Sequence, residues 1–185
     1  MSIRVDWEGP YSPEIVMRDY CLNSDIRRDF GLYQIYGPHD LYSNKKRPHE
    51  KKVLLYIGKT TDGSTFAGRI GAQGFCHNAE SDFEVFLGRV AARATVDQWK
   101  RDVDDAEKLL IVRYAPPYNG QGVGDLRADQ LHSSTAVVHN HGEKADLDEY
   151  VRAEDVTYAL VSPKGANKRL QTDRAAQLSQ LQRGG

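Results

Sequence analysis

The chain has 185 residues, of which 39% are hydrophobic and 28% are charged, and its formal net charge is −1. This length favours one domain with an appended element, and the composition excludes disordered and fibrous proteins. No run approaches the ~18 apolar residues of a membrane span, and the first residues lack a signal-peptide pattern, so we expect a cytoplasmic protein without membrane contact. Cys21 and Cys76 lie far apart and are expected to be reduced thiols.

The charge is distributed unevenly along the chain. The small net charge counts against a simple nucleic-acid-binding domain, which is usually basic. Basic residues nevertheless cluster at 44–52 and 164–183, whereas acids gather at 97–107 and 146–155. Basic patches around an acidic centre suit a protein that holds phosphates and binds a divalent cation, although solvated surface charge explains any one cluster equally well.

The N-terminal half is expected to contain a helix, two strands and a second short helix, in that order. Ser12 followed by Pro13 is typical of a helix start. The run GLYQIYG at 31–37 is short, aromatic and bounded by glycines, which predicts a strand. The apolar run VLLYI at 53–57 predicts a buried second strand, antiparallel to the first. A short helix is expected around 64–70.

A long helix is the clearest element of the second half. It follows a third strand expected at 83–90. Thr95 and Gln98 form a capping box, which predicts a helix from there to about residue 113. Glu107 lies at the edge of its apolar stripe, as the only acid expected to point inward. The stripe itself contains Val96, Trp99, Val103, Ala106 and Leu110.

The pattern weakens beyond this helix. Short strands are expected at 135–138 and 157–161, and a weakly amphipathic basic helix at 167–183. The His-Asn-His run at 139–141 spells the letters of another nuclease motif, but no cysteine pair supports that interpretation, so we expect a structural or loop role. Overall, we predict an α/β (α+β) fold with a small central antiparallel β-sheet of about three strands flanked by helices.

Two tripeptides in the first two strands point to a known family. The runs GLY at 31–33 and YIG at 56–58 resemble the two motifs of the GIY-YIG nucleases, with Leu replacing Ile in the first. The helix bearing Glu107 and the turn PPYN at 116–119 resemble the family's metal-binding helix and its Pro-x-Asn turn. Either tripeptide alone is common by chance, whereas all these features in this order are not.

The resemblance also implies a domain organisation. The nuclease-like core covers 31–120, between an N-terminal helical extension at 1–30 and a C-terminal extension with the basic helix at 121–185. The interval between the two motifs is long, because a basic segment is inserted there. We expect this segment to contact DNA phosphates through Lys45, Lys46, Arg47, Lys51 and Lys52.

The resemblance implies roles for the acid, the arginine and the tyrosines. Glu107 would hold the metal, Mg²⁺ or Mn²⁺, with one ion per active site. Arg69 offers a planar, permanently charged fork for the phosphate in its transition state. Tyr33 and Tyr56 correspond to the tyrosines that the family places around the attacking water. Each of these residues also has a structural alternative, in the core or on the surface.

The remaining candidates would assist these groups. A phenol has a reference pKa of ~10, so a tyrosine base needs a nearby cation, for which Lys59 is the candidate beside the metal. His77 could accept the proton instead, and the choice between the tyrosines and this histidine stays open. Asn119 is better explained as ordering the turn and the site than as a group that does chemistry.

The predicted function is therefore metal-dependent hydrolysis of DNA phosphodiester bonds. The extra segments around the core resemble the stand-alone type II restriction endonucleases of the family, for which a homodimer would cut both strands. A structure-specific repair or mobile-element nuclease is the first alternative, and a catalytically idle DNA-binding module is the second. The recognition sequence depends on side-chain geometry in a groove and is not readable from the chain.

Overall fold

The computed structural model describes residues 1–20, 29–38, 52–61, 63–73, 82–114, 116, 118–119 and 131–154. The elements in chain order are β1 (Ser2–Tyr11), α1 (Pro13–Asp19), β2 (Gly31–Gly37), β3 (Val53–Thr60), α3 (Phe66–Gly71), β4 (Glu84–Val90), α4 (Val96–Tyr114), β5 (Val137–Gly142) and β6 (Tyr150–Arg152). In these ranges no helix is long and apolar enough to cross a membrane.

A single six-stranded sheet forms the centre of the molecule, in the order β3-β2-β4-β1-β5-β6. β1 and β5 are parallel, and the other neighbouring strands pair antiparallel. The expected mixed α/β class is confirmed, but the expectation of about three strands is wrong. It covers only β2, β3 and β4, because β1, β5 and β6 come from the segments interpreted as extensions.

Strand β1 explains most of this difference. Ile3, Val5 and Trp7 are buried and alternate with more exposed neighbours, which is the period-two signal of a strand. The first 30 residues therefore contribute a strand inside the sheet in addition to helix α1. β1 lies between β4 and β5. The Asn140 side chain of β5 accepts a hydrogen bond from Trp7 Nε1 of β1 and donates one to the Asp148 carbonyl. The His-Asn-His run is thus part of a strand, not a loop, and its asparagine is structural.

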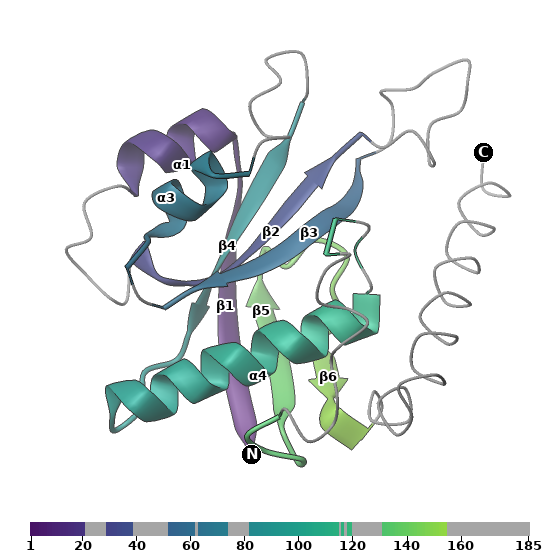
Figure 1. Ribbon diagram of the computed structural model, residues 1–185. Coiled ribbons are helices and arrows are strands. Elements are labelled where there is room, and N and C mark those ends of the chain that lie inside the picture. The colour runs from purple at the N-terminus through teal and green to yellow at the C-terminus, as the bar shows by residue number, and fades with distance from the viewer. Residues whose placement is uncertain are drawn as a thin grey trace, which may run out of the picture.

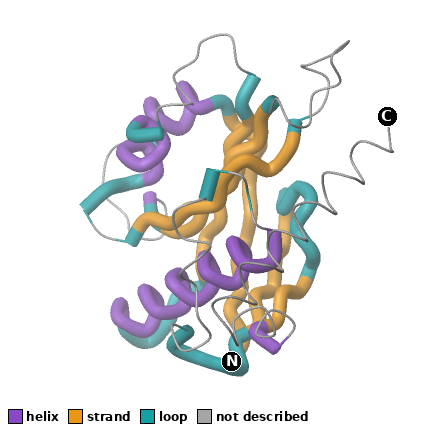
Figure 2. Tube along the Cα trace, turned by 45° about the vertical axis from the view of Figure 1, so that its right-hand side comes forward, coloured by secondary structure: helices purple, strands orange, loops and turns teal. Residues whose placement is uncertain are grey.

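Helices cover both faces of the sheet. Successive strand residues point to opposite faces, and in β2 Leu32 joins one core cluster and Tyr33 the other. α1 and α3 lie together over the Tyr33 face (Figure 1). α4 crosses the other face and contacts β2, β3, β4 and β6 (Figures 1 and 2). Each face of the sheet therefore carries its own helical layer.

The predicted helix starts are confirmed. Ser12 Oγ accepts a hydrogen bond from the Ile15 amide at 3.4 Å, and Thr95 Oγ1 accepts one from the Gln98 amide at 3.2 Å. Most of the predicted α4 stripe is buried, but Val96, in its first turn, is 53% exposed. The segments expected at 157–161 and 167–183 lie outside the described residues.

Candidate active site

The two tripeptide motifs meet across neighbouring strands. The β2–β3 register places Tyr33 opposite Gly58, and the rings of Tyr33 and Tyr56 stack with centroids 5.8 Å apart. A Cβ atom on Gly58 would lie 2.4 Å from Cζ of Tyr33 and 2.7 Å from Cε1 of Tyr56. The glycine of the second motif is therefore required because both phenol rings pack closely against its backbone.

Tyr33 is the buried member of the pair. It is 1% exposed, its ring packs edge-on against Phe66 of α3, and its hydroxyl accepts a hydrogen bond from Gln73 Nε2 at 3.4 Å. Burial, followed by the neighbouring Tyr56 and Glu107, raises the pKa of Tyr33 far above its ordinary value. The phenol therefore stays protonated at neutral pH. Tyr56, by contrast, is only half-buried.

Glu107 reaches the same place from α4. Its side chain is 17% exposed, and Lys59 Nζ of β3 lies 2.9 Å from its Oε2. Burial raises the pKa of Glu107, although the charge of Lys59 opposes the shift. Burial lowers the pKa of Lys59, but Glu107 and Asp104 outweigh it and the pKa is raised. Among the described residues, Lys59 is the only hydrogen-bonding partner of the Glu107 carboxylate.

A second carboxylate holds Lys59 from the other side. Asp104, one helical turn before Glu107, forms ion pairs with Lys59 and Lys108, and His132 Nε2 lies 3.2 Å from its Oδ2. Desolvation raises the pKa of Asp104, but Lys108 and Lys59 outweigh it and the pKa is lowered. Asp104 therefore stays ionised and anchors the lysine that neutralises Glu107.

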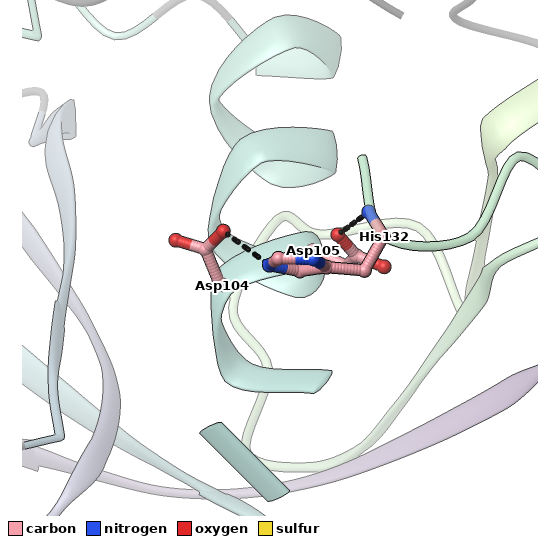
Figure 3. A group of neighbouring side chains, drawn as sticks. All are labelled: Asp104, Asp105 and His132. Carbon is pink, nitrogen blue, oxygen red and sulfur yellow. Dashed lines mark hydrogen bonds and ion pairs between the residues drawn. The ribbon is translucent and has the colours of Figure 1, made fainter. Parts of the chain in front are cut away.

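Asp104, Asp105 and His132 form the one group of potential metal ligands found in the described part of the chain, with ligand atoms within 4.8 Å of one another (Figure 3). Both oxygens of Asp105 already accept backbone hydrogen bonds, from His132 at 2.7 Å and Ser133 at 3.0 Å. Those of Asp104 face two ammonium groups and the imidazole. A dication here would have to displace these donors, so the group is better explained as a structural anchor.

Asn119 connects the end of α4 to the outer edge of β3. Its Oδ1 accepts from the Ile57 amide at 2.9 Å, and its Nδ2 donates to the Ile57 carbonyl at 2.7 Å. The Tyr118 amide also donates to the Leu55 carbonyl. Both ends of the Asn119 amide are thus engaged by the strand residue between Tyr56 and Gly58, which supports the ordering role expected for it.

Among the described residues, Arg69 and Lys52 make no recorded contact with this cluster. Arg69 lies on α3 and is exposed, and its side chain has no hydrogen bond or ion pair to another described residue. Lys52 forms ion pairs with Asp82 and Glu84, at 2.7 and 2.6 Å. The remaining candidates, His77, Lys45, Lys46, Arg47 and Lys51, lie outside the described residues.

The expectation that Glu107 is the only inward acid of the long helix is wrong. Asp102 and Asp105 are 1% and 0% exposed, because Arg93 pairs with the first and the backbone of 132–133 binds the second. Asp104 could have been found from its spacing, since it lies three residues before Glu107 on the same helix surface. His132 had no such signal, because only the tertiary fold brings it to α4.

Comparisons with protein-family models, with curated proteins and with solved structures found no match for this chain.

Proposed function

We propose that this chain is a metal-dependent endonuclease of the GIY-YIG type that hydrolyses phosphodiester bonds in DNA. The observation that carries the proposal is the convergence of Tyr33, Tyr56, Lys59 and Glu107 from β2, β3 and α4. These residues come from three separate segments of the sequence, and each supplies a group that phosphodiester hydrolysis uses. The motif glycine Gly58 allows the two phenols to approach, which supports the resemblance independently of the residue letters.

The donor set around Glu107 fits the expected metal. The carboxylate is largely buried, and its partner is an ammonium group, so the position already accommodates a cation. Mg²⁺ commonly takes one or two protein carboxylates and completes its shell with waters and substrate oxygens. Glu107 would hold it, and the ion would supply charge neutralisation on the phosphate, which contributes several kcal/mol. Lys59 would then remain bound to Asp104, next to the phosphate.

The tyrosines divide into two roles. Tyr33, buried and with a raised pKa, keeps its proton, and its ring and its hydrogen bond from Gln73 hold it in place beside Tyr56. Tyr56 is half-buried on the same side and can reach a water molecule in the solvent. We therefore assign contact with the attacking water to Tyr56, with His77 as the alternative proton acceptor. Arg69 would approach the phosphate from α3 when DNA binds.

The type of nuclease rests on the segments around the motif strands. The basic run at 44–52 lies in the sequence between β2 and β3, the two strands that carry the tyrosines. Its cations would hold the DNA backbone, with Lys52 contributing least because two carboxylates already bind it. A restriction-type enzyme that acts as a homodimer fits a single active site per chain, since each site cuts one strand.

Cleavage of a supercoiled plasmid tests the proposal. The wild-type protein is incubated with Mg²⁺ or with EDTA, and Glu107→Gln, purified in the same way, controls for contaminating nucleases. We expect products only from the wild type with Mg²⁺. Discrete fragments indicate a restriction enzyme, and scattered nicks a structure-specific or nonspecific nuclease. DNA binding without any product would instead identify an idle binding module, and equal cleavage by Glu107→Gln would refute the assigned site.

A further inference from the structure

An open hollow of about 220 Å³ lies directly beside the candidate active site. It is formed by three separate parts of the chain: the end of β3, the first half of α4, and the turn that precedes β5. Lys59 belongs both to this hollow and to the Glu107 ion pair, so the two sites share a wall. The lining residues are Lys59, Thr61, Lys100, Arg101, Asp104 and His132.

The hollow carries a surplus of positive charge. Its lining includes three permanent cations and an imidazole against a single carboxylate. Lys59 and Lys108 together balance that carboxylate, Asp104, and the neighbouring Glu107, so the surplus does not depend on Lys59. Arg101 is exposed and its side chain has no hydrogen bond or ion pair to another described residue, so its guanidinium is available to an incoming anion. The charge of the hollow therefore favours binding of an anion.

The wall that carries His132 is fixed by a buried group. Asp105 is 0% exposed, and its two oxygens accept the backbone amides of His132 and Ser133. The turn is thereby tied to α4 at a position one helical turn after Arg101. This arrangement leaves the imidazole of His132 facing Asp104 and the hollow.

We propose that this hollow binds a backbone phosphate of the DNA strand, next to the phosphate that is cleaved. The inference rests on the proposed nuclease function and adds a second phosphate position to it. Arg101 and Lys100 would contact the phosphate oxygens, and Thr61 and His132 offer further polar contacts. Because Lys59 lines the hollow and also pairs with Glu107, the bound phosphate would lie close to the cleaved bond.

Duplex binding across a salt series, in EDTA so that no DNA is cut, tests the proposal. We compare the wild type with Arg101→Gln, with the double variant K100Q/R101Q, and with Arg152→Gln as the matched control. Arg152 is an exposed arginine on β6, at the sheet edge opposite β3. The plot of log affinity against log salt falls with a slope of about −0.9 for each phosphate contact, so each lost contact makes the slope shallower by about 0.9. We expect the slope to become shallower by about 0.9 for Arg101→Gln and by up to about 1.8 for the double variant, and to stay unchanged for the control.

A second measurement locates the contact. Neutral methylphosphonates replace the phosphates of the duplex one at a time. We expect one replacement that weakens binding of the wild type but leaves the affinity of Arg101→Gln unchanged. Unchanged slopes for both variants, an equal loss in the Arg152→Gln control, or no duplex binding by the wild type would each overturn the proposal. Because binding is measured without cleavage, the outcome is independent of the plasmid assay. The plasmid assay shows whether the proposed nuclease function is wrong, and the binding assay shows whether the hollow is merely solvated.

Discussion

Asp105 and Glu107 are two acids on the same helix, two residues apart, and they differ in what binds them. Burial raises the pKa of both carboxyl groups. The oxygens of Asp105 accept two backbone amides of the 132–133 turn. The carboxylate of Glu107 faces the side chain of Lys59. Burial and pKa direction, which are common signs of functional acids, therefore do not separate the two residues.

The exchangeability of the partner does separate them. A backbone amide cannot leave its acceptor unless the turn itself rearranges. The ammonium of Lys59 is carried by a flexible stem and keeps a second partner in Asp104 when it moves. Glu107 can therefore exchange one cation for another without loss of structure, whereas Asp105 cannot. The comparison predicts that substitutions at the two positions affect different properties of the protein.

The largest expected effect is on cleavage. Glu107→Gln should reduce cleavage by about 10³-fold or more, because the loss of the metal ligand removes several kcal/mol of transition-state stabilisation. Its DNA binding and folding should be nearly unchanged. Asp105→Asn should instead lower the free energy of unfolding by about 1–3 kcal/mol, since the amide NH2 group, itself a donor, would face one of the two backbone donors. Single-turnover cleavage and urea unfolding of both variants measure the two effects.

The reverse pattern would break the comparison. If Asp105→Asn abolishes cleavage while its unfolding curve stays that of the wild type, the group around Asp104 and His132 is functional. If Glu107→Gln unfolds more easily and still cuts DNA, then the Lys59–Glu107 pair is a structural bridge.

The same contrast applies to two arginines. Arg93 is bound to Asp102, which is 1% exposed, and to the Ser2 carbonyl. Arg69 is exposed on α3. Arg69→Ala should reduce turnover by about 10²–10³-fold with a smaller effect on affinity, and Arg69→Lys should restore little, because the fork is lost. Arg93→Ala should cost about 3–5 kcal/mol of stability, since it leaves a buried carboxylate unpaired.

Steady-state and single-turnover kinetics distinguish these roles for Arg69. A normal single-turnover rate with weakened binding would show that Arg69 only contacts the DNA backbone. Arg93→Ala is the matched control, because the cleavage that remains per folded molecule should be that of the wild type.

The paired tyrosines allow a finer test of the comparison. Tyr56→Phe should slow cleavage by at least about 10²-fold if its hydroxyl contacts the attacking water. Tyr33→Phe removes the buried hydroxyl that accepts the hydrogen bond from Gln73, which is worth about 1 kcal/mol, or roughly fivefold in rate. Single-turnover rates of the two variants are compared at several pH values. A slower Tyr33→Phe would assign the water contact to the buried phenol, and a slower His77→Ala would assign it to the histidine.

Local signals in the sequence predicted the part of the fold that surrounds the motifs. The glycine-bounded run at 31–37, the apolar run at 53–57 and the capped helix from Thr95 were all readable, because each depends on neighbouring residues. The antiparallel pairing of the first two is confirmed. Strand β1 carries a local signal too, the alternation of Ile3, Val5 and Trp7, but no motif accompanies it, and the sequence prediction contains only a helix in the first 30 residues.

Long-range contacts were not readable in the same way. His132 reaches Asp104 only because Asp105 binds the backbone of its turn. The sequence does not record that Lys59 is held between two carboxylates, since the contact joins a strand to a helix. For the same reason the sequence pattern indicates solvated charges at Asp102 and Asp105, although tertiary partners allow both side chains to be buried.

The smallest expected effect concerns Asn119, whose amide is bound by backbone as the carboxylate of Asp105 is. Asn119→Ala leaves the amide and the carbonyl of Ile57 without their side-chain partner at an edge strand, where water replaces part of the interaction. We expect a loss of about 1–2 kcal/mol in the free energy of unfolding. Cleavage should fall less than about tenfold, because Tyr56 and Gly58 on either side of Ile57 keep their strand pairing. Asn119→Asp keeps one of the two hydrogen bonds and should be intermediate in stability. Urea unfolding and single-turnover cleavage measure both variants. A large loss of cleavage with wild-type stability would mean that Asn119 acts on the substrate. Its amide would then leave the backbone of Ile57 to contact DNA.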